Sequence, residues 1–159
     1  ELAKQLGFTL PMMGGKGYSF IQKNQPEIKQ ATILTEQKVA VSPYGETVRF
    51  GGTLEIAGTN QKVDMRRVQG IFESINRYYP SFEAKFPEEN QIWKGLRPCS
   101  PDGLPYIGFA PTYSNVLVGS GHSMMGISLA PATGKLLAEL HQQKDTTMEI
   151  AGFEVGRFA

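Results

Sequence analysis

The clearest periodic pattern of apolar residues along the 159-residue chain runs from residue 64 to residue 79. Apolar side chains recur there at steps of three and four, which places them on one face of an α-helix; they are Met65, Val68, Phe72, Ile75 and Tyr79. Asp64 comes just before them and can accept hydrogen bonds from the free N–H groups of the first turn. Pro80 follows and stops the helix. The pattern predicts an amphipathic helix that packs across a sheet.

A second pattern, rich in β-branched residues, extends from residue 31 to residue 57. Turn-forming residues divide it into short segments, and the short connections predict antiparallel strands. Ser42-Pro43-Tyr44-Gly45 suits a type I turn, and Gly51-Gly52 marks a bend or a bulge. We expect a short strand at residues 18–22 and further strands near residues 31–35, 38–42, 46–50 and 53–57.

The last third of the chain alternates extended segments with glycine-containing turns. We predict strands at residues 92–97 and 105–109, a buried strand at 115–119 and a short extended piece at 152–159. The buried strand leads through a loop at residues 119–126 into an apolar helix that reaches about Leu140. Ala130, Ala132 and Gly134 would let this helix approach a sheet closely. The complete pattern predicts an α+β fold, with a mixed, mainly antiparallel sheet packed against helices.

Composition narrows the classes of function. A formal net charge of +1 with scattered basic residues gives no electrostatic basis for binding nucleic acid or a membrane surface. The single cysteine, Cys99, excludes an internal disulfide and a multi-cysteine zinc site, and it favours a reducing compartment, so we expect a cytoplasmic protein. No apolar run approaches the roughly 20 residues that span a bilayer. The common catalytic signatures are also missing from the sequence: a GxGxxG after a strand, a Walker lysine, CxxC, HExxH and GxSxG.

Three segments nevertheless could carry chemistry, and each has a purely structural alternative. Arg97 lies at the end of a predicted strand, before Pro98. Its planar guanidinium could bind a carboxylate through two parallel hydrogen bonds, or it could pair with a local acid such as Asp102. The loop at residues 119–126 could direct N–H groups and a helix dipole towards negative charge, or it could be a tight turn without a ligand. Residues 10–17 are predicted to form a loop, and the third segment, Gly14-Gly15-Lys16-Gly17-Tyr18-Ser19, is most simply interpreted as a flexible turn.

Within the second segment, His122 is on its own more typical of a hydrogen-bonded loop residue than of a catalyst, and Met124 and Met125 could fill a core.

In their order along the chain, these segments resemble the C-terminal half of the D-amino-acid-oxidase-like FAD oxidoreductases, which include D-amino-acid dehydrogenases and glycine oxidases. Lys16-Gly17-Tyr18-Ser19 is similar to the loop where the family's chain enters the substrate domain. Trp93-x-Gly-Leu-Arg97-Pro, followed by Pro101-Asp-Gly-x-Pro-x-Ile-Gly108, resembles the arginine strand and the turn after it. Gly119-x-Gly-His-x-x-x-Gly126 with Ala130-Pro-Ala-Thr-Gly134 is similar to the last strand and helix. Residues 23–63 match only in pattern.

The resemblance implies an amine oxidation in which the substrate passes a hydride from its α-carbon to FAD, without a strong base on the protein. It implies that Arg97 holds the substrate carboxylate, and that Tyr106 and Met124 are further substrate-binding residues. The turn that would line the pyrimidine edge of the flavin consists of His122, Ser123, Met124, Met125, Gly126, Ile127 and Ser128. The resemblance also divides the chain into two parts. Residues 1–114 form a substrate-binding domain, and residues 115–159 form a strand and a helix that return to the FAD-binding domain.

Two departures from the family pattern bear on the substrate. Glycine oxidases carry a second arginine where this chain has Met124, and a substrate tyrosine near the position of Val39, for which Tyr44 and Tyr106 are the available replacements. We therefore expect an apolar pocket, supplied by Met124 and Met125, and a D-amino acid or a related amine as substrate. Glycine, sarcosine or another secondary amine is the alternative, and a non-catalytic ligand-binding or interaction module is a second one.

The resemblance also implies a partner domain, because the family binds the adenosine and pyrophosphate of FAD through a fingerprint that this sequence lacks. We therefore expect a part of a longer enzyme that alone binds FAD weakly or not at all and is inactive. An apolar face left without its partner domain predicts self-association. Peripheral contact of the parent enzyme with the inner membrane stays open.

Overall fold

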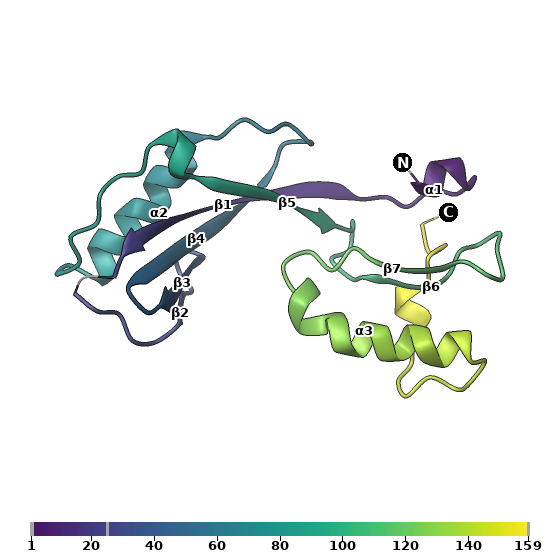
Figure 1. Cartoon of the computed structure of the whole chain (residues 1–159). Coiled ribbons are helices and arrows are strands. Elements are labelled where there is room, and N and C mark those ends of the chain that lie inside the picture. The colour runs from purple at the N-terminus through teal and green to yellow at the C-terminus, as the bar shows by residue number, and fades with distance from the viewer. Residues whose placement is uncertain (1, 25, 159) are drawn as a thin grey trace. The chain divides into compact units, whose positions relative to one another are not determined.

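The computed structural model describes residues 2–24 and 26–158, which form two compact units (Figure 1). The first, here called the sheet unit, consists of residues 15–96. The second, here called the loop unit, consists of residues 1–14 and 97–159. Residues 97–114, which the sequence placed with the preceding segment, thus share a unit with residues 115–159, because β6 and β7 pair and α3 packs on them.

A five-stranded sheet in the order β2-β3-β4-β1-β5 is the main feature of the fold. Its strands are β1 (Met13–Lys23), β2 (Thr32–Leu34), β3 (Val39–Tyr44), β4 (Thr47–Ile56) and β5 (Trp93–Cys99). The pairs β1–β4, β2–β3 and β3–β4 are antiparallel. A mainly antiparallel sheet with helices confirms the α+β class expected from the sequence.

Strand β1 is far longer than the strand predicted at residues 18–22, and the prediction of a loop over residues 10–17 is wrong for its second half. Gly15 and Lys16 pair with Ile56 and Glu55, so the ladder of β4 overrides the low strand propensity of the glycines. The register shifts between Lys16 and Tyr18, where β4 contributes one residue more than β1. Such a bulge is a common use of glycine and of irregular backbone in a sheet.

Strand β4 is continuous through Gly51-Gly52, so the two strands predicted at residues 46–50 and 53–57 are one. The irregularity comes one residue later, at Thr53, whose φ is +65°. The turn before β4 also differs from the prediction: Pro43 lies within β3, and Tyr44 pairs with Thr47 across a two-residue loop. Gly45 opens that loop with a φ of +59°, which suits a two-residue hairpin better than a type I turn over residues 42–45.

Helix α2 (Met65–Tyr78) covers one face of the sheet, as the apolar periodicity predicts. Asp64 is its N-cap and accepts a hydrogen bond from the N–H of Arg66, and Tyr79 ends it before Pro80. Gly52 of β4 lies under this helix, where a Cβ atom would come within 3.1 Å of Ile71 Cγ1. The buried core between sheet and helix consists of Tyr18, Phe20, Leu34, Val39, Val41, Val48, Phe50, Val68, Ile71, Ile75, Phe82 and Ile92.

The loop unit is built on an antiparallel pair, β6 (Tyr106–Phe109) and β7 (Leu117–Ser120), with helix α3 (Gly126–His141) packed against both. A four-residue helix, α1 (Leu2–Gln5), stands near the start of the chain. Strand β7 is half-buried rather than buried, and the tail predicted as extended forms a short 3₁₀ helix at Ala151–Phe153. None of the described helices is long and apolar enough to cross a membrane.

The close approach of α3 to its sheet occurs at residues other than those predicted. Ala130, Ala132 and Gly134 are exposed. The contact is made instead at Gly119 of β7, where a Cβ atom would lie 2.9 Å from Leu137 Cδ1 and 3.2 Å from Thr133 Cγ2. The small residue that permits the approach is therefore on the strand.

Candidate functional site

The end of β5 and the loop at residues 119–126, here called the glycine loop, were two separate signals in the sequence. They lie side by side in the loop unit. Cys99 and His122 form an isolated antiparallel bridge, and the Ser123 N–H donates a hydrogen bond of 2.9 Å to the Pro98 carbonyl. Gly121 allows this approach, since its φ is +81° and a Cβ atom there would lie 3.0 Å from the Tyr106 ring. The backbone that carries Arg97 is therefore fixed against the loop that precedes α3.

His122 is held by the helix that follows it. Its Nε2 lies 2.8 Å from the Thr133 hydroxyl oxygen, and its carbonyl accepts a hydrogen bond of 2.9 Å from the Met125 N–H. Ser123 adopts a φ of +51°, which turns the chain sharply into the helix. The side chain of His122 thus connects the glycine loop to α3 through its hydrogen bond with Thr133, as expected of a hydrogen-bonded loop residue.

The first turn of α3 presents backbone donors without a cap. Met125 is the N-cap residue, and its side chain makes no capping hydrogen bond. The first intrahelical bond at this end is donated by Leu129 to the Met125 carbonyl. The N–H groups of Gly126, Ile127 and Ser128 therefore have no partner inside the helix, and the positive end of the helix dipole adds to their attraction for negative charge.

Apolar side chains surround this helix start and are exposed. Met124 is 64% exposed, Ile127 is 93% exposed, and Met125 and Leu129 are also on the surface. The two methionines therefore do not fill a core, which was the structural alternative for them. Exposed apolar side chains beside open N–H donors favour contact with a partly apolar, partly polar group.

Tyr106 lies inside the loop unit. Its side chain is 0% exposed, and its hydroxyl donates a hydrogen bond of 2.7 Å to the Pro11 carbonyl. The Arg157 guanidinium stacks 4.0 Å from the centre of its ring. A residue so enclosed offers no surface to a substrate, and we leave Tyr106 out of the proposed site. Tyr44, the other available tyrosine, is exposed at the end of β3 in the sheet unit.

Asp102 is bound by an arginine that sequence reasoning did not identify. Arg157 donates from Nε to one carboxylate oxygen at 2.9 Å and from Nη2 to the other at 3.0 Å. The bonds from Arg157, opposed by partial desolvation, lower the pKa of Asp102 to about 2. The two residues are 55 positions apart, so no local pattern in the sequence reveals the pair.

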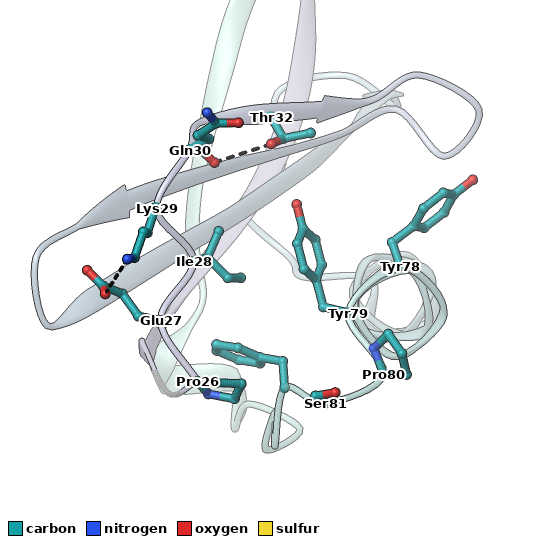
Figure 2. Close-up of a pocket in the computed structure, with 11 residues that line it drawn as sticks. Pro26, Glu27, Ile28, Lys29, Gln30, Thr32, Tyr78, Tyr79, Pro80 and Ser81 are labelled. Carbon is teal, nitrogen blue, oxygen red and sulfur yellow. Dashed lines mark hydrogen bonds and ion pairs between the residues drawn. The ribbon is translucent and has the colours of Figure 1, made fainter.

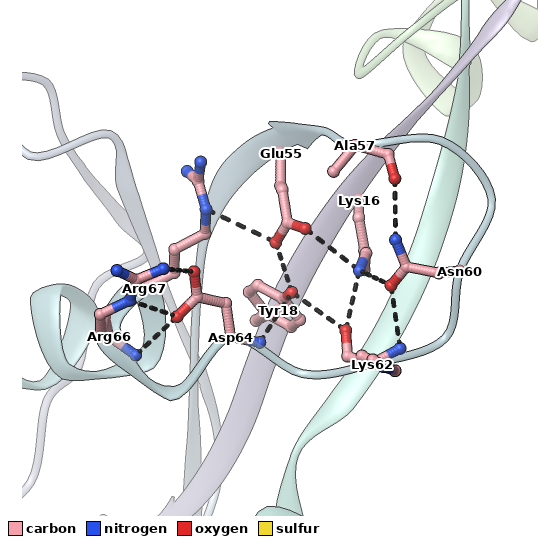
Figure 3. Close-up of polar contacts among 9 residues, drawn as sticks. All are labelled: Lys16, Tyr18, Glu55, Ala57, Asn60, Lys62, Asp64, Arg66 and Arg67. Carbon is pink, nitrogen blue, oxygen red and sulfur yellow. Dashed lines mark hydrogen bonds and ion pairs between the residues drawn. The ribbon is translucent and has the colours of Figure 1, made fainter.

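A buried polar cluster occupies the sheet unit between β1, β4 and the start of α2 (Figure 3). The Tyr18 hydroxyl donates to Glu55 and accepts from the Asp64 N–H, while Lys16 Nζ lies 3.2 Å from Glu55 and also donates to Asn60 and to the Lys62 carbonyl. The hydrogen bond from Tyr18, opposed by burial, lowers the pKa of Glu55, whereas burial, with the bond to Glu55, raises the pKa of Tyr18. The cluster fixes the loop at residues 57–63 to the sheet. Sequence reasoning missed it, because Lys16 was placed in a loop at residues 10–17 instead of in the strand that pairs with Glu55.

A hollow of about 610 Å³ lies elsewhere in the sheet unit, between the segment at residues 26–32 and the end of α2 (Figure 2). Tyr78, Tyr79 and Phe82 form part of its wall. None of the residues predicted to bind substrate or cofactor lines it, so we assign it no part in the candidate site. Among the described residues, no group of three or more His, Cys, Asp or Glu side chains could hold a metal ion.

Comparison with known protein families identifies the chain. Residues 1–140 match the model of the FAD dependent oxidoreductase family that is designated DAO. The chain belongs to this family. The match covers the sheet unit, the end of β5, the glycine loop and nearly all of α3, which are the segments that carried the resemblance in the sequence.

Several solved protein structures share the fold of this chain. Glycine oxidase from Geobacillus kaustophilus is 26% identical with a TM-score of 0.85, over 99% of this chain and 42% of that one. L-proline dehydrogenase from P. horikoshii is 19% identical with a TM-score of 0.80, over 97% of this chain and 42% of that one. Iminodiacetate oxidase from Chelativorans sp. BNC1 is 17% identical with a TM-score of 0.79, over 96% of this chain and 42% of that one. The chain thus spans about two fifths of the length of each of these proteins.

The residues of the loop unit fit one end of the cofactor that this family uses. The uncapped N–H groups of Gly126, Ile127 and Ser128, with the helix dipole, suit a polar ring edge that gains negative charge. The exposed side chains of Met124 and Ile127 suit its apolar surroundings. The sequence supplies no GxGxxG motif for the pyrophosphate, so the fit concerns the flavin end of FAD and not its adenosine end.

Proposed function

We propose that the chain is the substrate-binding part of a longer FAD-dependent enzyme that oxidises amino acids or related amines, with D-amino acids as the preferred class. The observation that carries this proposal is the junction of β5 with the glycine loop, through the Cys99–His122 bridge and the Ser123–Pro98 hydrogen bond. That junction holds Arg97, a potential carboxylate ligand, on the same rigid backbone as the open first turn of α3. The family match supports the cofactor.

Each group then has a separate task. Arg97 binds the substrate carboxylate through its planar fork and so orients the α-carbon. The N–H groups of Gly126, Ile127 and Ser128 stabilise negative charge on the ring edge, at no reorganisation cost because the helix is already formed. Met124 and Met125 provide an adaptable apolar wall for the substrate side chain. His122, through Thr133, holds the loop in place.

The chemistry needs no strong base from the described residues. Bound FAD would accept the hydride that leaves the α-carbon, while the amine nitrogen loses a proton to solvent. The product is an imine, which water hydrolyses to a keto acid and ammonia. The contribution of the protein is therefore orientation, exclusion of water and electrostatic stabilisation.

A second candidate substrate class is glycine or a secondary amine such as sarcosine. The similarity to glycine oxidase, at 26% identity over 99% of this chain, favours it. The apolar character and exposure of Met124 favour a larger side chain instead. The two classes differ in the size of the group next to the α-carbon, and a substrate panel separates them.

The test uses the full-length polypeptide that contains these 159 residues, purified and assayed with an artificial electron acceptor. We expect bound FAD and turnover of D-amino acids, with a lower kcat/KM for glycine and sarcosine. Arg97→Lys should lower kcat/KM by about 10- to 100-fold, because a charged hydrogen bond is worth about 1.5–3 kcal/mol. Arg77→Lys, at an exposed position of α2, is the matched control.

Turnover that favours glycine or sarcosine would establish the second candidate instead. A protein without FAD or turnover would reject both and would leave a non-catalytic binding module.

A further inference from the structure

The C-terminal tail, residues 154–158, returns to the turn that follows Arg97 in the loop unit. The 3₁₀ helix that precedes the tail contacts β6 (Figure 1). Val155 of the tail is buried, so the tail is anchored in the unit rather than free in solution. It holds Arg157 beside residues 100–104, here called the clamped turn.

The guanidinium of Arg157 binds the clamped turn at two points. Its Nε and Nη2 donate to the two carboxylate oxygens of Asp102 at 2.9 and 3.0 Å, and Nη2 also donates to the Leu104 carbonyl at 2.7 Å. Nη1 donates to the Glu154 carbonyl at 3.0 Å, so each nitrogen of the group has an acceptor. The side chain is only 11% exposed and stacks on the Tyr106 ring. A bidentate pair fixes direction as well as distance, so this arginine holds the turn in one geometry.

Hydrogen bonds inside the clamped turn extend this constraint to β5. Asp102 Oδ1 accepts a hydrogen bond of 3.0 Å from the Leu104 N–H, and the Ser100 hydroxyl donates one of 2.7 Å to the Leu104 carbonyl. That carbonyl therefore accepts from both Ser100 and Arg157. Ser100 is buried and directly follows the last residue of β5. Arg97 lies on the same strand, three positions before Ser100, so the clamp acts close to it along the chain.

The glycine loop packs on the same residues. A Cβ atom on Gly121 would lie 3.0 Å from the Tyr106 ring and 3.6 Å from Ser100 Cβ, so both side chains are in close contact with the loop. The other contact of the Tyr106 ring is the Arg157 guanidinium, 4.0 Å from its centre. The tail, the clamped turn and the glycine loop thus form one contiguous set of contacts, and the end of β5 joins it at the bridge to the loop.

We propose that Arg157 is a positioning residue: by fixing the clamped turn against the glycine loop, it holds Arg97 in the geometry that binds the substrate carboxylate. The effect on substrate binding rests on the proposed function, whereas the coupling of the tail to the glycine loop rests on the contacts of the loop unit alone. Arg157 acts through Arg97 and needs no contact with substrate or cofactor.

Amide hydrogen exchange tests the coupling without any turnover. The Ser123 N–H donates to the Pro98 carbonyl and so reports on the junction of β5 with the glycine loop. In the 159-residue chain, Arg157→Gln should accelerate exchange of this amide at least about tenfold, as measured by NMR, because the junction opens locally once the clamp is gone. Arg66→Gln breaks an equally bidentate pair with Asp64 in the sheet unit, and it should leave the Ser123 rate unchanged.

A second amide distinguishes local opening from general loss of stability. Leu136 is buried in the middle of α3, and its exchange should accelerate much less than that of Ser123. Arg157→Lys keeps the charge but not the planar fork, so it should give an intermediate Ser123 rate and provides a milder variant. An unchanged Ser123 rate in Arg157→Gln, or an equal acceleration of both amides, overturns the coupling.

Kinetics of the full-length enzyme test the effect on substrate binding. Arg157→Gln should raise KM for the amino acid at least about fivefold and change kcat by less than about twofold, whereas Arg66→Gln should change neither. If Arg157 acts through Arg97, adding Arg157→Gln to Arg97→Lys should raise KM by less than about twofold more.

Three outcomes separate this inference from the proposed function. The full fivefold increase repeated in the Arg97→Lys background contradicts the positioning role, because a purely structural effect is independent of Arg97. A fall in kcat at unchanged KM contradicts it as well. Absence of turnover in the unsubstituted enzyme rejects the proposed function and, with it, the part of Arg157 in substrate binding, while hydrogen exchange still decides the coupling.

Discussion

The Tyr18 hydroxyl donates a hydrogen bond to Glu55 at an oxygen–oxygen distance of 2.5 Å, although the two residues are 37 positions apart in the chain. Both side chains are buried, and Lys16 pairs with the same carboxylate. The Tyr18 oxygen also accepts a hydrogen bond from the Asp64 N–H, which places it at the start of α2. One phenol thus connects β1, β4 and the helix that covers the sheet.

Removal of that oxygen should destabilise the sheet unit. Tyr18→Phe leaves the Asp64 N–H without its acceptor and Glu55 without one of its donors, so we expect a loss of about 2–3 kcal/mol in the free energy of unfolding. Tyr44→Phe, at a position that is 65% exposed, is the control and should change stability by less than about 0.5 kcal/mol. Urea denaturation followed by circular dichroism measures both. Equal stabilities of the two variants would show that the cluster does not support the fold.

The same cluster shows where sequence reasoning reached its limit. The helix at residues 65–78 and its Asp64 cap follow from local periodicity and were predicted closely. The strand through Gly15 and Lys16 was not, because its stability comes from pairing with Ile56 and Glu55, about 40 residues later. A glycine-rich segment is a loop by propensity, and only a non-local ladder makes it a strand.

The Arg157–Asp102 pair predicts a change in an acid titration. The folded pKa of Asp102, about 2, is lower than its ordinary value of 3.8, so the pair contributes stability that is complete above about pH 4 and is lost as the pH falls towards 2. Arg157→Gln should raise the titration midpoint of the Asp102 carboxyl towards 3.8, as measured by NMR. Arg77→Gln should not move it. An unchanged midpoint in Arg157→Gln would remove the pair as the cause.

Two glycines that look alike in the sequence should respond in opposite ways to alanine. Gly119→Ala brings a methyl group within 3.2 Å of Thr133 Cγ2 and 2.9 Å of Leu137 Cδ1, and should cost about 1–3 kcal/mol of stability. Gly134→Ala meets no atom within 4 Å in the interior of α3, and should gain about 0.5–1 kcal/mol. Thermal unfolding of the two variants decides. A gain of stability in Gly119→Ala would mean that α3 moves freely against β7.

The candidate site was predicted in its parts but not in its assembly. Arg97 and the glycine loop each had a structural alternative in the sequence, and their connection depends on the Cys99–His122 bridge, which no local spacing reveals. Tyr106 was considered as a replacement for the substrate tyrosine of glycine oxidases, but its side chain is buried in the loop unit, where its hydroxyl donates a hydrogen bond to the Pro11 carbonyl. The hydrogen bond of 3.0 Å that Arg49 Nε donates to the Ser19 hydroxyl joins residues 30 positions apart, so it too could not be predicted from the sequence.

The exposed apolar start of α3 predicts that the chain associates with itself. Ile127 is 93% exposed, next to exposed Met124 and Met125, and contiguous apolar surface of this kind favours association in water. Ile127→Glu places a charge on this surface and should shift the sedimentation coefficient of the concentrated protein towards that of a monomer. The acidic side chain lies in the first turn of α3, where it suits the helix dipole, so the fold should be preserved. Ile33→Glu, at an isoleucine of β2 that is 71% exposed, is the matched control, and an identical shift in both variants would assign the association to general charge rather than to α3.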